Sequence, residues 1–404
     1  TTGAVTFVPE KDFVGTAKGV TVQATATITN EKGEKSTITA DATYTPTVVA
    51  AVPTAQPAKS IDVQGATQKG KPTFAGTTVT VNGQEKPVTI KENSYTLLDK
   101  DGNEVTSTPA YAEDGTTVIG THTIDPTTGE VTFTPTDKSY SGKVTPVSVQ
   151  AESSNGIKVS TTYTPEIVPV TPTAQDAATK DVQGKTQTGK PTFEGGKATV
   201  DGVEKTVEID EDTPATFEDG STSKTIPGEG TYTVAPDGTV TFVPEKTFTG
   251  EGTGVTVKRV DKNGTEVTAK YTPTVTPVTP TATPAESVAP QGIVQTGTVT
   301  FTAGNPVAPI NKETITLLDE NGKPAESVDA KSPEGKVIGT YTVDKETGVV
   351  TFTPTDKSYS GDVVAAKVQA KDANGTPVET TYTPKITPVT PTADPAETTG
   401  LQGQ

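Results

Sequence analysis

The sequence predicts an all-β chain, built as a tandem array of antiparallel, Ig-like β-sandwich repeats joined by short Pro/Thr-rich linkers. Three observations predict this fold class. The segment VTFTPTDKSYSG occurs twice verbatim, at Val131–Gly142 and Val350–Gly361. Apolar and polar residues alternate in short runs, which is typical of strands with one buried face. Turn sequences separate these runs, and no run keeps a 3.6-residue apolar period.

Two further motifs set the length of the repeat. Looser copies of the shared segment begin at Val5 and Val240, and a YTP motif follows each of the four copies. The YTP tyrosines are Tyr44, Tyr163, Tyr271 and Tyr382, which lie 119, 108 and 111 residues apart (163−44, 271−163, 382−271). A PTA motif opens at Pro53, Pro172, Pro280 and Pro391 with the same intervals. This period is too long for a solenoid repeat and fits one small domain.

The repeat motifs predict where each unit begins and ends. We expect the C-terminal part of a repeat at 1–52 and the start of a further repeat at 391–404. Complete repeats are expected at 53–171, 172–279 and 280–390. Because the sequence opens and stops inside a unit, we expect it to be a piece of a longer protein.

The last complete unit shows the expected strands most clearly. Alternating runs occur at Thr298–Ala303, Thr314–Asp319, Val337–Val343, Val349–Pro354, Val363–Lys371 and Val378–Pro384. The expected turns between them are Asp319-Glu320-Asn321-Gly322, Lys345-Glu346-Thr347-Gly348 and Asp372-Ala373-Asn374-Gly375. Gly and Asn tolerate the positive φ that hairpin turns require. Six or seven short strands in about 110 residues favour an antiparallel sandwich.

Phe and Tyr recur at matching positions in the copies, which predicts that they form the core. Fifteen of the 20 do so: Phe7, Phe13, Tyr44, Phe74, Phe133, Tyr140, Tyr163, Phe193, Phe242, Phe248, Tyr271, Phe301, Phe352, Tyr359 and Tyr382. A packing aromatic recurs with the fold, whereas a binding aromatic tends to be peculiar to one copy.

Proline-rich segments join the units, at Val168–Ala174, Thr276–Ala282 and Thr387–Ala393. Such segments favour the extended polyproline conformation and act as semi-rigid spacers. Neighbouring units are therefore expected to sit in line, without folding back on one another.

The composition excludes several classes of function. The net charge of −17 and pI near 4.6 argue against nucleic acid and against membrane insertion or simple membrane association. The chain has no Cys, so disulfides and thiol chemistry are excluded, and only one His. The usual components of zinc sites and of Cys–His or Ser–His catalysis are therefore missing.

The one histidine, His122, invites a catalytic or metal-binding interpretation. Its counterparts are Tyr232 and Tyr341, which precede the shared Phe by 10 or 11 residues as His122 does. A position that holds Tyr in two copies is expected to be a strand position, so we assign it no chemistry.

Acidic turns such as Asp99-Lys100-Asp101-Gly102 and Asp261-Lys262-Asn263-Gly264 superficially suggest calcium loops. They lack the Glu that a helix–loop–helix calcium site places six residues after the Gly, so we expect hairpin turns. Weak calcium binding between domains remains an alternative, given the acidity. The Gly250–Gly254 segment lies in a β context, which argues against a nucleotide site.

A lysine recurs in the shared segment, at Lys11, Lys138, Lys246 and Lys357. Some bacterial adhesins carry an autocatalytic Lys–Asn amide bond, formed in an apolar core. These lysines lie among Asp, Glu and Ser in expected exposed loops, which does not favour the required pKa shift. Loss of one ammonia per bond in the intact mass would reveal such a bond. We predict no catalytic, cofactor-binding or metal-binding residues.

The assembled motifs resemble the CshA-type fibril repeat of cell-wall-anchored streptococcal-type surface adhesins. The motifs that carry this resemblance are V-T-F-[TV]-P, Lys-x-[FY]-x-Gly, [TK]-Y-T-P and P-T-A with a trailing Q-G. The resemblance implies repeats that build a fibril projecting from the cell, with ligand recognition in a non-repetitive region. It also implies an extracellular location at the cell wall, with covalent anchoring through a tail absent from this sequence. A fifth motif, [GT]-x-P-T-F, follows the Q-G. Ala289–Gly292 and Gly297–Phe301 depart from the pattern, because they lose parts of the V-Q-G and K-P-T-F sequences.

Two functions follow from this interpretation. The first is a structural stalk that projects a distal ligand-binding region for cell adhesion. The second is adhesion by the repeats themselves, to a host extracellular-matrix glycoprotein such as fibronectin or to repeats on a neighbouring cell in a biofilm. An exposed sheet edge can pair with another strand, which makes the second possible. We expect no enzyme activity and no cofactor.

Overall fold

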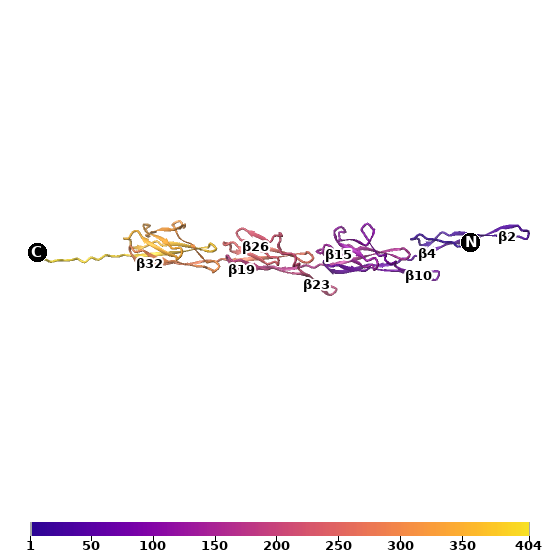
Figure 1. Ribbon diagram of the computed structural model, residues 1–404, viewed down its shortest axis with the longest axis horizontal. Helices are drawn as coiled ribbons and strands as arrows, with labels where there is room; N and C mark the ends of the chain where they lie inside the picture. The colour runs from indigo at the N-terminus through magenta and orange to yellow at the C-terminus, as the bar shows by residue number, and fades with distance from the viewer. Residues whose placement is uncertain (1, 404) are drawn as a thin grey trace. The chain divides into compact units, whose positions relative to one another are not determined.

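The computed structural model describes residues 2–403, and these residues form strands and turns with no helix (Figure 1). The chain divides into two compact units. The first comprises the chain up to Thr173 together with Glu194–Asp210 and Val260–Glu266. The second comprises Ala174–Phe193, Glu211–Arg259 and the chain from Val267 onward.

The first unit opens with a small, open β structure. Strand β1 (Gly15–Thr16) pairs with β4 (Thr47–Val48), and β2 (Val20–Thr29) forms a long hairpin with β3 (Lys35–Tyr44). Almost every residue of this hairpin is exposed.

The prediction that Phe7, Phe13 and Tyr44 belong to a core is wrong. Phe7 and Phe13 are half-buried and contact each other at a centroid distance of 6.3 Å, and Tyr44 is 39% exposed. Two separate two-stranded sheets offer no second layer that could cover these rings.

The remainder of the first unit contains a two-sheet sandwich. One sheet has the order β13-β14-β15-β7 and the other has the order β12-β11-β16-β17-β6. The strands are β5 (Thr54–Gln56), β6 (Ala58–Val63), β7 (Gln68–Gly70), β8 (Thr73–Ala75), β9 (Thr77–Val81), β10 (Gln84–Val88), β11 (Thr96–Leu98), β12 (Glu104–Val105), β13 (Ser107–Tyr111), β14 (Val118–Ile124), β15 (Val131–Pro135), β16 (Val147–Glu152) and β17 (Lys158–Val168).

The next strands repeat this order. One sheet has the order β20-β27-β26-β25 and the other has the order β19-β30-β29-β24. Strand β30 of the second sheet also pairs with β28. A hairpin of β22 and β23 lies in the first unit. The strands are β18 (Thr173–Gln175), β19 (Ala177–Val182), β20 (Gln187–Gly189), β21 (Thr192–Glu194), β22 (Gly196–Val200), β23 (Val203–Val207), β24 (Thr216–Phe217), β25 (Ser223–Ile226), β26 (Gly230–Val234), β27 (Val240–Pro244), β28 (Gly250–Glu251), β29 (Val255–Val260) and β30 (Glu266–Thr276).

A third sandwich completes the second unit. Its sheets have the orders β33-β39-β38-β37 and β32-β42-β41-β35-β36, and β40 pairs with β42. The strands are β31 (Thr281–Thr283), β32 (Ala285–Pro290), β33 (Gln295–Thr298), β34 (Thr300–Thr302), β35 (Ile310–Leu318), β36 (Pro324–Ala325), β37 (Ser327–Lys331), β38 (Val337–Val343), β39 (Val349–Pro354), β40 (Gly361–Asp362), β41 (Ala366–Asp372) and β42 (Pro377–Thr387).

Each predicted run of the last repeat overlaps a strand, but two long strands were missed. Strand β32 has the sequence AESVAP and β37 has SVDAK, so neither offers a row of large apolar residues. The three predicted turns are confirmed, with positive φ at Gly322, Gly348 and Gly375.

One strand pair in each sandwich is parallel, which the sequence pattern did not predict. The first long strand of each sandwich pairs in parallel with its last strand over six residues: β6 with β17, β19 with β30 and β32 with β42. These strands lie at the two ends of a repeat. The pair therefore joins, at one edge of a sheet, segments that are about 100 residues apart in the sequence.

The predicted Pro-rich linkers are partly structured. Strand β31 takes up part of Thr276–Ala282, and Val170 and Val278 in two of these segments are buried. The irregular parts of these linkers are therefore shorter, and less exposed to solvent, than a free polyproline spacer would be.

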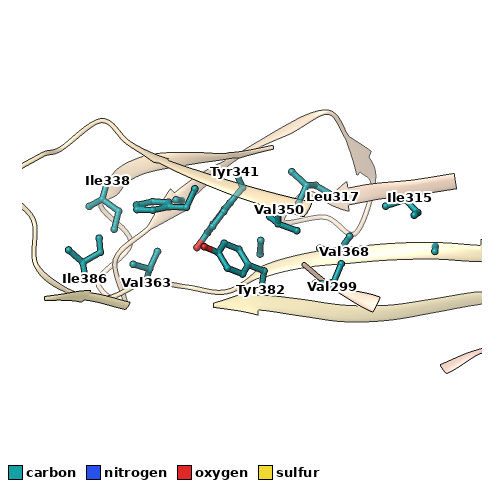
Figure 2. Packing of buried hydrophobic residues seen from close by; sticks show 14 residues of the cluster. Val299, Ile315, Leu317, Ile338, Tyr341, Val350, Val363, Val368, Tyr382 and Ile386 are labelled. Atoms are coloured by element: carbon teal, nitrogen blue, oxygen red, sulfur yellow. The ribbon is translucent and has the colours of Figure 1, made fainter. Parts of the chain in front are cut away.

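An apolar core fills each sandwich, with Tyr and Phe at its centre. Figure 2 shows Tyr341 and Tyr382 of the third sandwich between the two sheets, with Ile338 and Val363 nearby. The two tyrosine rings meet edge to face at 6.1 Å. Equivalent contacts are made by Tyr232 with Tyr271 and by His122 with Tyr163. The core prediction is confirmed for six aromatics of the three sandwiches, which are buried: Phe133, Tyr163, Phe242, Tyr271, Phe352 and Tyr382. The other six predicted aromatics of these sandwiches are partly buried and pack against the same cores: Phe74, Tyr140, Phe193, Phe248, Phe301 and Tyr359.

In each of the three sandwiches the tyrosine of the YTP motif is completely buried, and its hydroxyl is held in a small hydrogen-bonded group. In the first sandwich the Tyr163 hydroxyl lies 2.7 Å from Ser60 Oγ, which also lies 2.7 Å from Gln68 Oε1. Gln68 Nε2 then donates to the carbonyl of Glu166. These residues belong to β17, β6 and β7, so the group ties the parallel strand pair to the opposite sheet.

The other two sandwiches repeat this group. Thr179 takes the place of Ser60 beside Tyr271 and Gln187, and Ser287 takes it beside Tyr382 and Gln295. The glutamine again donates to a backbone carbonyl of the last strand, at Thr274 and Lys385. The Q-x-G sequence of β7, β20 and β33 also has a steric cause, because a Cβ on Gly70, Gly189 or Gly297 would overlap the tyrosine ring.

We predict that Gly189→Ala destabilises the second sandwich by about 1–3 kcal/mol, because the added methyl group displaces the Tyr271 ring. Hydrogen exchange of the β27 and β30 amides in the whole chain measures this. Thr188→Ala, an exposed neighbour in the same strand, is the control and is expected to leave exchange unchanged. If these amides are as well protected from exchange in the Gly189→Ala variant as in the unmodified chain, the steric argument is contradicted.

Candidate functional site

His122 lies in the middle of β14 and is buried, as its strand position predicted. It pairs across the sheet with Phe133, as Tyr232 pairs with Phe242 and Tyr341 with Phe352. Its Nδ1 and Nε2 atoms have no hydrogen-bond partner among the described residues, and burial lowers its pKa to about 4. A neutral imidazole packed between Phe133 and Tyr163 acts as a core side chain.

A hollow opens beside this position in the first and third sandwiches, and the second sandwich has a hollow lined by corresponding strand residues. Around His122 it is lined by Asp99, Lys100, Thr108 and Tyr111. Around Tyr341 the equivalent hollow is lined by Asp319, Glu320, Val328 and Lys331. A third hollow is lined by Glu218, Asp219, Lys224 and Thr253, among others. The hollow recurs with the fold, but its charged residues differ, so the copies share no set of chemical groups there.

Glu229 is a buried acid that the sequence analysis missed. It occupies the position before the strand glycine at which the other sandwiches carry the core residues Ile119 and Ile338. The Tyr232 hydroxyl donates to its carboxylate, and so do the Thr253 amide at 3.0 Å and the Thr253 hydroxyl at 2.7 Å. An alignment of the three copies, VIGTH at Val118–His122, GEGTY at Gly228–Tyr232 and VIGTY at Val337–Tyr341, shows the Glu in place of Ile.

The hydrogen bonds determine the charge state of Glu229. Burial alone would raise the pKa of Glu229, but the bonds from Tyr232 and Thr253 outweigh it and lower the pKa below its usual value. Burial and the same carboxylate raise the pKa of Tyr232. The pair is therefore an ionised carboxylate with a neutral phenol, so it holds no proton poised for transfer near pH 7.

A second charged residue also enters the core region of the middle repeat. Arg259 is buried, and its Nη2 lies 3.1 Å from Glu211 Oε2. The corresponding residues, four positions before the Asn-Gly turn, are the buried Ala151 and Ala370. The middle repeat therefore carries two buried charged residues that the other repeats lack, and both are paired and internal.

The acidic turns use their carboxylates to hold the backbone. Asp99 Oδ1 accepts from the amides of Asp101 and Asn103, and Asp261 Oδ1 accepts from those of Asn263 and Thr265. Hydrogen bonds from Asn103 lower the pKa of Asp99. Among residues 2–403, no group of three or more His, Asp or Glu side chains could hold a metal ion. The expectation of hairpin turns is therefore confirmed for both segments.

The recurring lysines Lys11, Lys138, Lys246 and Lys357 are all exposed. An amide bond of the adhesin type needs an apolar surround, which these positions lack. Gly250–Gly254 begins in β28 and precedes another strand, so it does not form a phosphate loop at a helix. The prediction that the chain has no catalytic, cofactor or metal residues stays a prediction.

We predict that acid selectively weakens the first sandwich. The folded pKa of His122, about 4, lies below the unfolded value of about 6.5, so stability present above pH 6.5 is lost as pH falls toward 4, by about 3 kcal/mol. His122→Tyr, the residue of the other copies, is expected to abolish this loss. Hydrogen exchange of β14 at pH 7 and pH 4.5 measures it; equal acid sensitivity in both proteins contradicts the prediction.

We predict that Glu229→Gln destabilises the second sandwich by about 1–3 kcal/mol at pH 7, because a Gln amide cannot accept every bond that the carboxylate accepts. Since the folded pKa is lowered, the contribution of Glu229 is present above its unfolded pKa and is lost as pH falls through the folded value. Thermal unfolding of the whole chain measures it, with the exposed Glu251→Gln as control. No difference between these variants contradicts the assignment.

Comparison with known proteins agrees with the repeats seen in the structure. A family model described as the surface adhesin CshA repetitive domain matches residues 1–48, 50–167, 169–275 and 277–386. The NMR structure of repeat domain 13 of the fibrillar adhesin CshA from Streptococcus gordonii is 69% identical over 17% of this chain and 86% of its own, with a TM-score of 0.12.

More distant structures are also similar. A tetra-tandem repeat from the extending region of a large adhesion protein is 18% identical, covers 91% of this chain and 82% of its own, and has a TM-score of 0.24. Mouse cadherin-23 EC22–24 is 14% identical, with coverages of 84% and 100% and a TM-score of 0.33. These scores are low, so the fold assignment depends on the strand pairing described above. No curated protein matches the chain.

The described residues include no helix that could cross a membrane. The family model matches four successive segments that together span nearly the whole sequence, and each contains a VTF and a YTP motif. The chain therefore belongs to the family of surface adhesin CshA repetitive domains.

Proposed function

We propose that this chain is a stalk segment of a bacterial surface adhesin, a spacer that holds a distal ligand-binding region away from the cell. The observation that carries the proposal is the repetition of one mechanical arrangement, the parallel pairing of the first and last long strands in each sandwich. A spacer under tension is pulled at those two strands.

The geometry of the pair suits this task. When two parallel neighbours are pulled from opposite ends, their hydrogen bonds lie across the direction of force and must break together. In each sandwich the buried Tyr–Ser/Thr–Gln group adds side-chain bonds at the same place. A force along the chain therefore acts on a strand pair that both backbone and side-chain hydrogen bonds hold together, and breaking these bonds together raises the kinetic barrier to unfolding under load.

The surface charge supports the same role. With a net charge of −17, neighbouring copies on a crowded cell surface repel one another and remain soluble. We propose an extracellular location, with covalent attachment to the cell wall through a tail outside this sequence. The division into repeats at Pro53, Pro172 and Pro280 remains part of this proposal.

Adhesion by the repeats themselves is the alternative. Strands β13, β25 and β37 each end a four-stranded sheet and leave one edge unpaired by another strand of that sheet. Such an edge can add a strand from a host glycoprotein or from a neighbouring copy.

Two measurements on the intact chain separate these functions. A compact protein of this length has a radius of gyration of about 22 Å, and a stalk is expected to give a clearly larger value in small-angle scattering. The stalk is also expected to sediment as a monomer and to leave immobilised fibronectin unoccupied. A compact particle contradicts the stalk, and specific retention on fibronectin or self-association favours the alternative.

A further inference from the structure

A second set of recurring contacts lies where one repeat meets the next. In the first unit, Asn263 Nδ2 donates to the backbone carbonyl of Gln64 at 2.8 Å, although the two residues are 199 positions apart. Asn263 belongs to the Asp-x-Asn-Gly turn between β29 and β30, and Gln64 begins the Gln-Gly turn after β6. Both residues lie inside the same compact unit.

The Gln64 side chain completes this contact from its own side. Its Oε1 accepts from the amide of Val170, and its Nε2 donates to the Ser139 carbonyl and to Thr265 Oγ1. Gln64 is 4% exposed, so the contact is dry. The Gln64 side chain therefore binds Val170, in the segment that leads out of its own repeat. Its backbone carbonyl binds Asn263, in a turn of the next repeat.

The same arrangement recurs in the second unit with different residues. Asn374 Nδ2 donates to the Gln183 carbonyl at 3.2 Å, and Gln183 Oε1 accepts from the amide of Val278. Gln183 Nε2 donates to the Lys246 carbonyl, as Gln64 does to that of Ser139. Gln183 and Asn374 are both buried.

Apolar packing adds to the first of these contacts. Val63 of β6 and Val170 pack with Val200 and Val207 of the β22–β23 hairpin in a cluster separate from the three sandwich cores. Lys205 Nζ of the hairpin lies 2.6 Å from Asp62 Oδ1. In the third repeat a short loop, Ala303–Pro309, takes the place of the hairpin. The hydrogen-bonded contact is therefore the part that both junctions share.

Burial distinguishes these turns from ordinary hairpin turns. Asp372 and Asn374 are almost fully buried, whereas Asn321, in the Asp319–Gly322 turn of the same sequence type, is exposed. In both turns the aspartate accepts from the amides two and four positions later. The local geometry is the same, so the difference in burial comes from the Gln-Gly turn that covers one of them.

We infer that each Gln-Gly turn is a docking surface for the Asp-x-Asn-Gly turn of the following repeat, and that this contact couples neighbouring repeats. Gln291 forms a third copy of the surface. Its Oε1 accepts from the amide of Val389 and its Nε2 faces the Ser358 carbonyl, but Gln291 is only half-buried. Ile293 and Val294 beside it are more than half exposed. The occupant that fits is the Asn-Gly turn of one more repeat of this family. The inference does not depend on the stalk function.

Distance distributions between spin labels test the coupling in the whole chain. The chain has no cysteine, so paired cysteines at the exposed, equivalent positions Thr134 and Val243, or Val243 and Thr353, report on one junction each. Asn263→Ala is expected to shift the docked-to-undocked ratio of the first junction about fivefold toward the undocked form. This broadens the 134–243 distribution and leaves the 243–353 distribution unchanged. Asn374→Ala is expected to do the reverse.

Two further variants keep the result decisive. Asn321→Ala removes the same residue from an uncovered turn and is expected to leave both distributions unchanged. Asn263→Asp keeps the size of the side chain but replaces the donor with a carboxylate that repels the Gln64 carbonyl, so it is expected to broaden the first distribution without unfolding the turn. Unchanged distributions in both Asn263 variants overturn the inference, and so does broadening by Asn321→Ala equal to that by Asn263→Ala.

Discussion

The buried hydroxyl of the YTP tyrosine is the interaction on which the rest of each sandwich depends. It is the point at which three strands from distant parts of a repeat are linked: the last strand carries the tyrosine, the parallel first strand carries Ser or Thr, and a strand of the opposite sheet carries the Gln. An unpaired phenol in this position would cost the full desolvation penalty of a buried polar group. The parallel strand pair, the Q-x-G sequence and the link between the two sheets therefore all depend on the same hydrogen-bonded group.

The neighbouring core position shows how much variation this frame tolerates. His122, Tyr232 and Tyr341 each face the ring of a YTP tyrosine, but the hydrogen bonding of their polar atoms differs among the three sandwiches. The Tyr341 hydroxyl donates to the Val364 carbonyl, that of Tyr232 donates to Glu229, and His122 has no partner among the described residues. The aromatic ring is what packing requires, and the hydroxyl is satisfied by whatever the adjacent loop supplies.

The sequence predicted those features whose cause is local. Alternation of Val, Thr and Phe located the long antiparallel strands, and Asp-x-Asn-Gly located their turns, because side-chain period and positive φ are properties of a few adjacent residues. Strand β32 and the parallel pairing were missed because their cause lies about 100 residues away, in the strand that receives them. Gln64 and Asn263 were visible as parts of motifs, but only the structure shows that one motif of a repeat meets another motif of the next. Glu229 was missed because the recurring residues, and not the exceptions, were taken as informative.

The low apolar content has a physical consequence at the junctions. With 30% hydrophobic residues, a sandwich of this size has a thin core and a modest stability of its own. In an array whose units touch only their neighbours, the stability of each unit is the sum of its intrinsic term and its interface terms. Val170 and Val278 are buried in segments that a free linker would expose, and they add apolar area that neither sandwich contains by itself. A turn such as Asp372–Gly375 is then buried only when its neighbour is folded, so the folding of one repeat favours the folding of the next. An array of thin cores gains cooperativity from its junctions in this way, and it does so without a larger core in any single repeat.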